Sequence, residues 1–349
     1  MKDKILICGP CSAESQEQVL QTAFALSKRI ELTYFRAGVW KPRTRPGSFE
    51  GAGITALKWL QEVSNQTGIN VITEVATPDH VKAILKYGFK AVWIGARTTS
   101  NPFSVQEIAD ELRGTNIEVF VKNPVNPDIE LWQGALERFI KAGTNRIHAI
   151  HRGFYPFEKT KLRNIPKWEI PIELKRRMPD IKVICDPSHI AGSIDFIEEI
   201  AQKAMDLNMD GLMIESHIDP ENALSDSKQQ LEPRALSDML NNLVVRCEKF
   251  ENEVFIKQIE QLRDQIDSID QQMIELLSQR MGIVEEIGKY KQENNVSILQ
   301  LRRWQQIIES RIEQGQKLGL SEDFIRKLLT FVHKESITCQ SEIFKNNKD

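Results

Sequence analysis

Short apolar segments alternate with amphipathic segments over the first two thirds of the chain. Eight of the apolar segments are rich in β-branched residues: Ile5–Cys8, Thr33–Arg36, Val71–Glu74, Ala91–Ile94, Val119–Lys122, Ile147–Ile150, Lys182–Cys185 and Gly211–Glu215. Between them, apolar residues recur at helical spacing in segments such as Ser15–Arg29, Gly53–Thr67, Pro78–Tyr87 and Ser104–Leu112. This alternation predicts an α/β fold with a parallel sheet, closed into a (β/α)8 TIM barrel. An open doubly wound sheet is the alternative.

The pattern changes near Cys247. From about Asn252 to Lys291 there is no proline, and apolar residues recur at spacings of three and four, which predicts one helix of roughly ten turns. Two shorter helical patterns follow, Leu299–Gln314 and Ser321–Glu342, and Ser321 is a suitable N-cap for the second. We therefore expect a barrel domain over residues 1–248, a linker over 249–255 and a three-helix domain over 256–349. The apolar stripe of the long helix needs a partner, and a second copy of the chain would supply it.

Composition narrows the class of protein. The apolar share of 41% and the charged share of 27% are ordinary for a soluble globular protein. The net charge of −3 provides no overall basic surface for nucleic acid. The five scattered cysteines argue against a disulfide framework and for a reducing compartment. No apolar run approaches the ~20 residues of a membrane span, so we expect a cytoplasmic protein without a membrane segment.

Charged residues follow the predicted strands, where a barrel carries its catalytic groups. Six of them are cations that would converge on one mouth: Arg36, Lys41, Arg43, Arg97, Lys122 and Arg152. Six cations at one rim fit a ligand with several negative charges, such as a phosphate plus a carboxylate. The alternative for each single residue is an exposed cation paired with a nearby acid.

Four further residues at the same rim could bind a metal ion. Cys11, His189, Glu215 and Asp226 would offer a thiolate, an imidazole and two carboxylates, a mixed set suited to Mn, Fe, Co or Zn. Such an ion could polarise a carbonyl oxygen as a Lewis acid. Taken singly, His189 could be an ordinary loop histidine and Asp226 a helix-capping acid.

The string Cys8-Gly9-Pro10-Cys11 also matches the redox motif of thioredoxin-like proteins. That motif needs a thiol of low pKa at the start of a helix, after an earlier βα unit. Here it follows the first predicted strand and seven further strands come after it, so we reject a redox role.

The strings GPCSAE, KPRT, IGART, VKN, HRG, DPSH and IESH, in this order, resemble the type I beta branch of 3-deoxy-D-arabino-heptulosonate-7-phosphate (DAHP) synthases over about residues 1–248. That family condenses phosphoenolpyruvate with erythrose 4-phosphate. The resemblance implies one divalent metal ion held by Cys11, His189, Glu215 and Asp226. It assigns phosphoenolpyruvate to Arg36, Lys41, Arg97, Lys122 and Arg152, and the aldose phosphate to Arg43 and Thr44.

The implied reaction is attack by carbon 3 of phosphoenolpyruvate on the aldehyde, followed by addition of water at carbon 2 and loss of phosphate. Lys41 is the candidate to protonate the developing alkoxide, with water on the metal ion as the competing donor. The related 3-deoxy-manno-octulosonate-8-phosphate synthases, which use arabinose 5-phosphate, are the rival family. The KPRT loop favours the erythrose enzyme, because its relative usually carries an asparagine-containing loop there.

The helical segment, over about residues 255–345, resembles the all-helical chorismate mutases. The resemblance implies a chorismate site, an interlocked homodimer in which the first arginine reaches across from the partner chain, and the binding residues Arg263, Arg280, Lys291, Arg303, Ser336 and Gln340. The rearrangement needs cations on two carboxylates, for which the three arginines suit, and donors on the ether oxygen, for which Lys291 and Gln340 suit. Trp304 and Gln300 depart from the family pattern, which usually has acids there. The alternative is a dimerising or ligand-sensing module without turnover.

Together these resemblances predict a bifunctional synthase and mutase of aromatic amino-acid biosynthesis. The first predicted strand begins at residue 5, so we expect no N-terminal regulatory domain. We therefore expect the helical domain to provide feedback control by prephenate or chorismate.

Overall fold

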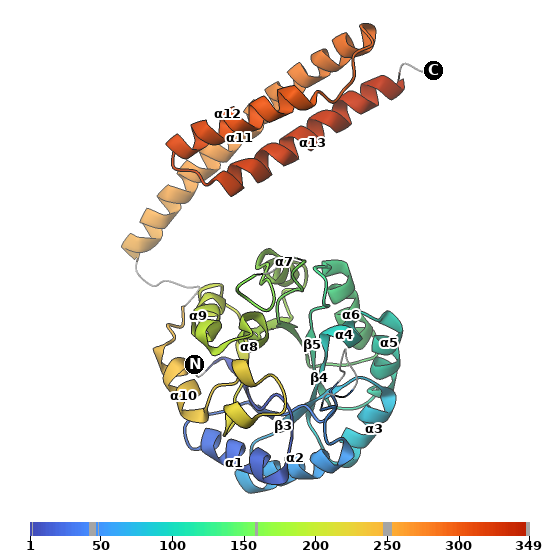
Figure 1. Ribbon diagram of the computed structural model, residues 1–349, viewed down its shortest axis with the longest axis vertical. Coiled ribbons are helices and arrows are strands. Elements are labelled where there is room, and N and C mark those ends of the chain that lie inside the picture. Colours follow the sequence, from blue (N-terminus) through green and yellow to red (C-terminus); the bar gives the residue numbers. More distant parts are fainter. Residues whose placement is uncertain (2, 42–46, 48, 158–159, 247–252, 347–349) are drawn as a thin grey trace. The chain divides into compact units, whose positions relative to one another are not determined.

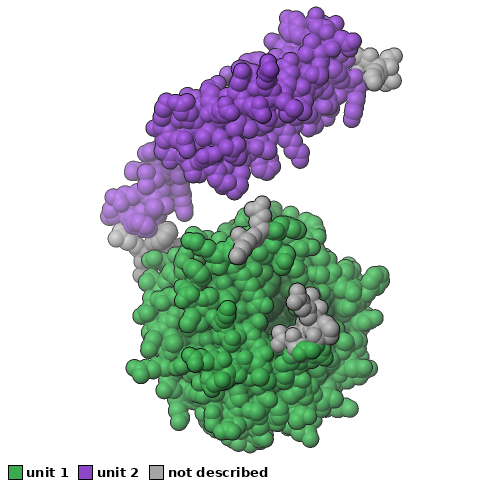
Figure 2. All heavy atoms as spheres, viewed as in Figure 1, with its two compact units in different colours: residues 1–248 green, residues 249–349 purple. Residues whose placement is uncertain are grey.

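The computed structural model describes residues 1, 3–41, 47, 49–157, 160–246 and 253–346. The chain forms two compact units, residues 1–248 and residues 249–349, which are coloured separately in Figure 2. The first unit is a barrel of strands and helices, and the second is built of helices (Figure 1).

Eight parallel strands of the described chain form a closed barrel in sequence order. They are β1 (Ile5–Gly9), β2 (Tyr34–Arg36), β3 (Val71–Val75), β4 (Ala91–Ile94), β5 (Glu118–Lys122), β6 (Ile147–His151), β7 (Lys182–Cys185) and β8 (Gly211–Glu215). The barrel closes where β1 pairs with β8, in register from Ile5 opposite Gly211 to Gly9 opposite Glu215. The predicted (β/α)8 barrel is confirmed, and the open doubly wound sheet is wrong.

Helices surround these strands, as Figure 1 shows. They are α1 (Gln16–Ser27), α2 (Ile54–Thr67), α3 (Pro78–Lys86), α4 (Ala96–Thr99), α5 (Pro102–Glu111), α6 (Ile129–Lys141), α7 (Glu169–Arg177), α8 (Pro187–Ala191), α9 (Ile197–Asp206) and α10 (Pro233–Asn242). Several begin at a residue whose side chain accepts a hydrogen bond from the first turn, such as Ser15 before α1 and Asp128 before α6. Such caps satisfy backbone N–H groups that the helix itself leaves unpaired.

Successive side chains along each strand point to opposite faces of the sheet, so the core has two layers. Side chains such as Ile7, Trp93 and Phe120 fill the barrel interior. Their neighbours, such as Cys8 and Val92, point the other way and pack against the surrounding helices. Because both faces of the sheet are buried, the strands appear in the sequence as continuous apolar runs.

A polar cluster occupies the amino-terminal end of the barrel interior. Glu118, which is 3% exposed, accepts hydrogen bonds from Tyr34 at 2.7 Å and lies 2.8 Å from His148 Nε2. Arg146 pairs with the same carboxylate. The buried carboxylate of Glu118 is therefore paired within the chain. Catalytic groups are expected at the opposite, carboxyl-terminal end of the barrel.

The described part of the second unit, residues 253–346, consists of three helices, α11 (Glu253–Glu293), α12 (Leu301–Lys317) and α13 (Glu322–Asn346). α13 packs against both α11 and α12. Gly288 allows the close approach of α11 to α13, since a Cβ there would lie 2.8 Å from Ile343 Cδ1. Ser321 caps α13 as predicted, accepting a hydrogen bond from Phe324 N at 3.3 Å. In the described part of the chain, no helix is both long and apolar enough to cross a bilayer.

Candidate active sites

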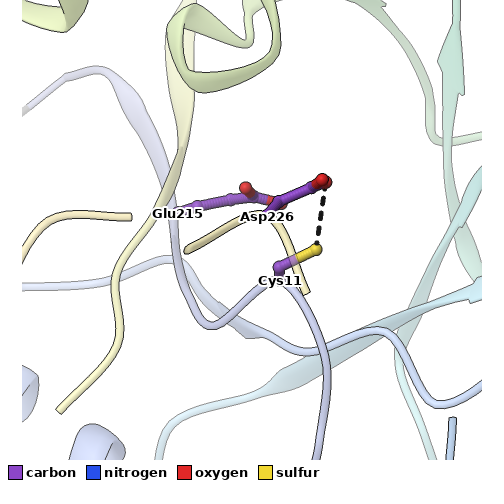
Figure 3. Close-up of side chains that lie close together, drawn as sticks. All are labelled: Cys11, Glu215 and Asp226. Carbon is purple, nitrogen blue, oxygen red and sulfur yellow. Dashed lines mark hydrogen bonds between the residues drawn. The ribbon is translucent and has the colours of Figure 1, made fainter. Parts of the chain in front are cut away.

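Three metal-competent side chains meet at the carboxyl-terminal end of the barrel. Cys11 follows β1, Glu215 ends β8, and Asp226 lies in the segment after β8. One donor atom from each lies within 4.8 Å of the other two. Figure 3 shows the Cys11 sulfur facing the Asp226 carboxylate, 3.5 Å from its Oδ2 atom. Cys11 and Glu215 are buried, which removes competing water from their donor atoms.

His189 lies at the edge of this cluster, on α8. Its Nε2 atom is 3.7 Å from Glu215 Oε1, and its Nδ1 atom is 3.0 Å from Asp186 Oδ1. A carboxylate behind a histidine fixes the ring so that the other nitrogen faces a metal ion. The donor set of one sulfur, one imidazole and two carboxylates therefore fits a divalent transition-metal ion.

The pKa shifts of two of these side chains, His189 and Glu215, match that role. Burial, with the nearby acids Glu215 and Asp226, raises the pKa of the Cys11 thiol to about 12, so an ion would have to displace the thiol proton to bind the thiolate. Burial also lowers the pKa of His189, which favours the neutral imidazole that binds metals. For Glu215 burial acts to raise the pKa, but His189 and Arg36 outweigh it, so the pKa lies below its usual value.

Two of the predicted cations stand beside the donor cluster. Arg36 donates to Glu215 Oε1 at 2.9 Å and lies over the Trp93 ring, 5.0 Å from its centroid. Its buried Nε and Nη1 atoms have no hydrogen-bond partner among the described residues. Lys122 pairs with Asp186 at 2.8 Å and faces the same ring. Unsatisfied buried donors are rare, and here they indicate the place of an anionic ligand.

The other cations lie around the same mouth. Lys41 Nζ is 3.1 Å from Cys11 Sγ. Arg152 donates to Asn164 Oδ1 at 3.1 Å, and burial lowers its pKa to about 10, with Arg163 and Arg97 close enough to contribute. The predicted residues Arg43 and Thr44 lie outside the described residues.

The Cys8-Cys11 pair does not have the properties of a redox motif. Burial raises the pKa of both thiols to about 12, whereas a redox-active cysteine needs a lowered pKa. Both cysteines are free. The sulfur of Cys8 belongs to the core between sheet and helices, and that of Cys11 to the donor cluster.

A second polar site lies between α11 and α13. Arg280 donates to Ser336 Oγ at 2.7 Å. One turn further along α13, Gln340 is buried, and its Oε1 atom has no partner among the described residues. Lys291 Nζ donates to the Ile298 carbonyl at 2.6 Å. Four of the six predicted chorismate residues thus come from the facing parts of two helices in one chain.

Arg263 and Arg303 stand apart from these four. Arg263 is on α11, about 25 Å along the helix from Arg280 at 1.5 Å per residue, so a single chain cannot bring them together. Arg303 is in the first turn of α12 with an exposed side chain. Its neighbour Trp304 stacks on His333 of α13 with ring centroids 3.8 Å apart. His333 is a neighbour of the site that the sequence did not reveal.

Comparison with known proteins identifies both units. Residues 2–248 match the model of the DAHP synthetase I family. The chain belongs to this family. Residues 262–341 match the model of chorismate mutase type II, so a domain of that class follows the synthase domain.

Similar proteins carry the corresponding names. A phospho-2-dehydro-3-deoxyheptonate aldolase of Thermotoga maritima is 30% identical over 68% of this chain and 68% of its own length. A solved structure of a DAHP synthase from Thermotoga maritima aligns with a TM-score of 0.62 and 30% identity, covering 68% of this chain and 67% of that one. A bifunctional chorismate mutase/prephenate dehydratase of Buchnera aphidicola is 31% identical over 24% of this chain, which spans only 22% of that protein.

Some residues of the synthase site were missed by sequence reasoning. Asp186 behind His189 lies inside the motif DPSH, and its position three residues before the histidine could have revealed it. Arg163, whose Nη1 atom lies 3.1 Å from Asp226 Oδ1, is in a loop without periodicity. Gln229 and Gln230 closely follow Asp226, but uncharged amides gave no chemical signal.

Proposed function

We propose that the barrel condenses phosphoenolpyruvate with D-erythrose 4-phosphate to give DAHP and phosphate, with one divalent ion of the Mn, Fe, Co or Zn class. The observation that supports this most directly is the juxtaposition of the donor cluster with Arg36, whose two buried N–H donors lack partners. An anion bound there would satisfy both donors and lie beside the ion.

The cations around the mouth would bind the substrates. Arg36, Arg97, Lys122, Arg152 and Lys41 would bind the carboxylate and phosphate of phosphoenolpyruvate. Arg43 and Thr44 would bind the phosphate of the aldose. The pairing of Lys122 with Asp186 and of Arg36 with Glu215 keeps these long side chains in place before the substrate arrives.

An ion held by Cys11, His189, Glu215 and Asp226 would supply Lewis-acid polarisation of the aldehyde oxygen. In the reaction, carbon 3 of phosphoenolpyruvate forms a bond to the aldehyde carbon, and the aldehyde oxygen becomes an alkoxide. Lys41 would donate the proton to that alkoxide; the distance of 3.1 Å between its Nζ atom and Cys11 Sγ supports this role. Water then adds at carbon 2, and phosphate leaves.

Two assays test the synthase reaction. The pure protein should convert erythrose 4-phosphate in preference to arabinose 5-phosphate; the opposite preference would assign it to the octulosonate synthases. Removal of metal by a chelator should abolish the reaction, and a series of Mn, Fe, Co and Zn additions should restore it and rank the ions. Full activity after exhaustive chelation would refute the metal centre.

For the helical domain, we propose rearrangement of chorismate to prephenate in a homodimer. Arg280, Arg303 and Arg263 of the partner subunit would bind the two carboxylates, with Ser336 beside Arg280, and Lys291 and Gln340 would face the ether oxygen. The hydrogen bond from Arg280 to Ser336 and the unpartnered Gln340 Oε1 support a ligand site between α11 and α13. Loss of chorismate absorbance with the wild type but not with Arg280→Ala would support turnover, whereas binding without turnover would make the domain a sensor.

We also propose that the protein is cytoplasmic. We further propose that prephenate or chorismate, bound to the helical domain, inhibits the synthase reaction of the barrel. Removal of residues 250–349 should leave an active synthase that prephenate no longer inhibits. The barrel unit has its own buried core, and the family model matches it without the helices. Inhibition that persists in the truncated protein would refute the regulatory role.

A further inference from the structure

Asp226 differs from the other proposed metal ligands in how its backbone is held. Cys11, His189 and Glu215 stand at or just beyond strand ends, which the barrel itself positions. Asp226 lies in the loop after β8, with φ 46° and ψ 36°, a left-handed conformation that costs a residue with a side chain about 1 kcal/mol or more. Neighbouring groups must therefore stabilise this loop.

Gln230 ties the loop to the Cys11 segment. Its Oε1 atom accepts a hydrogen bond from Cys11 N at 2.9 Å, and its Nε2 atom donates to the Ser225 carbonyl at 2.8 Å. The side chain is 2% exposed. One amide thus connects the backbone that carries Cys11 with the residue directly before Asp226.

Gln229 connects the two carboxylate ligands, contacting Glu215 directly and Asp226 through Arg163. Its Nε2 atom donates to Glu215 Oε2 at 2.7 Å, and its Oε1 atom accepts from Arg163 Nη1 at 2.7 Å. Because Arg36 holds the other oxygen of Glu215, both oxygens of this ligand have a defined direction. Gln229 is 1% exposed, so water does not compete for these bonds.

Arg163 completes the set. Its Nη1 atom lies 3.1 Å from Asp226 Oδ1, while Asp226 Oδ2 faces Cys11 Sγ at 3.5 Å. The Arg163 backbone N–H donates to the Ala191 carbonyl on the helix that carries His189. The next residue, Asn164, donates to the His189 carbonyl at 2.6 Å. The segment around Arg163 therefore connects Asp226 to the fourth ligand.

We propose that Gln229, Gln230 and Arg163 are positioning residues that hold the four ligands of the metal centre in register before the ion binds. The proposal rests on the metal-dependent function proposed above. A thiolate and two carboxylates carry three negative charges against two on the ion, and Arg163 offsets part of the remaining repulsion. Residues that orient metal ligands typically change metal affinity 10- to 100-fold when they are replaced.

The test is Mn²⁺ binding to the full-length protein by titration calorimetry. Gln229→Leu, Gln230→Leu and Arg163→Gln should each raise the Kd for Mn²⁺ by roughly 10- to 100-fold. Arg163→Lys, which keeps the charge, should give a smaller increase. The control is Gln106→Leu: Gln106 accepts from Arg138 at 2.9 Å between α5 and α6, so this variant also breaks an arginine–glutamine pair and should keep the wild-type Kd.

A second readout follows the ligands directly. Wild-type protein loaded with Co²⁺ should show the absorption of a cobalt–thiolate bond, and the Gln230→Leu spectrum should be altered because Cys11 has lost its tether. If a buried glutamine variant fails to fold, Arg163→Gln still decides, because the arginine side chain is 43% exposed.

The outcomes separate this proposal from the function on which it rests. Wild-type protein that binds no Mn²⁺ would overturn the metal centre and the positioning role together. Wild-type protein that binds Mn²⁺, with folded variants whose Kd lies within twofold of the Gln106→Leu control, would overturn the positioning role alone.

Discussion

The two units of this protein differ in how completely one chain builds them. In the barrel, Phe35 and Phe139 are fully buried, and the donor cluster, the amides that contact it and the predicted cations Arg36 and Lys122 all meet within one chain. In the helical unit, Ile269 and Leu276 on α11 are 55% and 63% exposed. Four of the predicted chorismate residues there come from facing parts of α11 and α13, but Arg263 lies far along α11.

The difference has a physical origin. A closed barrel buries both faces of its sheet, so local strand and helix patterns are sufficient to complete core and site. A long helix can cover only part of its apolar stripe with two shorter helices, and the remainder stays exposed until another surface covers it. The comparison predicts that synthase activity does not require association of two chains, whereas mutase activity does.

The largest expected effect is a difference in metal dependence: the synthase reaction should need the metal ligands, and the mutase reaction should not. Cys11→Ala should lower the synthase rate by roughly 10³-fold, since a Lewis acid contributes several kcal/mol to the barrier, and should leave the mutase rate within about twofold. Cys8→Ala, in β1 three residues before Cys11 but facing the helices, is the control. Paired assays of both reactions decide, and a loss of both activities in a folded Cys11→Ala protein would contradict independent sites.

The next effect tests the dependence on assembly. Ile269→Lys places a charge on the exposed apolar stripe and should convert the proposed dimer to monomers, with a loss of mutase activity of roughly 100-fold and an unchanged synthase rate. Sedimentation velocity with both assays measures this. Gln271→Lys, on the same exposed helix, should have no effect. A fully active monomer would show that one chain is sufficient for the mutase.

Mixing experiments sharpen the assignment of Arg263. Arg263→Ala and Arg280→Ala should each abolish the mutase activity. After unfolding and refolding together in equal amounts, they should recover about a quarter of the wild-type activity, because half of the dimers are mixed and each has one intact site. Mixing without refolding is the control. No recovery would place both arginines in the same site of one chain, or outside the site.

The smallest effect concerns the polar cluster at the amino-terminal end of the barrel. The pKa of Glu118 is lowered: burial acts to raise it, and the hydrogen bonds from His148 and Tyr34 outweigh that effect. A lowered folded pKa stabilises the fold above the unfolded pKa of about 4.5, and this contribution is lost as the pH falls through the folded value. Glu118→Gln should therefore lower the free energy of unfolding by about 1–3 kcal/mol at pH 7.

Urea unfolding at several pH values measures this contribution, followed by the fluorescence of tryptophans that lie mostly in the barrel. The difference between wild type and Glu118→Gln should shrink below pH 4.5. The exposed Glu107→Gln, on α5, is the control. A difference that stays constant down to pH 3 would contradict the assignment of the charge to Glu118.

Much of the fold could be predicted because its signals are local. The eight predicted strands correspond to β1 to β8 with ends that differ by a residue or less, because strands buried on both faces form uninterrupted apolar runs. The long helix was predicted as Asn252–Lys291 and observed as Glu253–Glu293. Its apolar spacing remains regular over many turns, which no strand pattern imitates.

The candidate sites were only partly predictable. Strand ends indicated Arg36 and Lys122, but their partners Glu215 and Asp186 follow from the barrel's closure, which brings distant residues of the sequence together. Gln229 and Gln230 carry no charge and no periodicity. Their importance depends entirely on which atoms lie within 3 Å of them, and no local pattern encodes that.

The sequence by itself determined the order of strands and helices, the change of architecture near residue 250 and the chemical types of the site residues, because these depend on local periodicity and composition. The tertiary structure alone decided that Cys11, Glu215 and Asp226 meet within 4.8 Å, that Arg36 keeps two buried donors unpaired, and that Arg263 is separated from Arg280. The reason is that closing a barrel is a long-range event, which places residues 11 and 226 side by side, whereas a straight helix keeps its residues as far apart as its length requires.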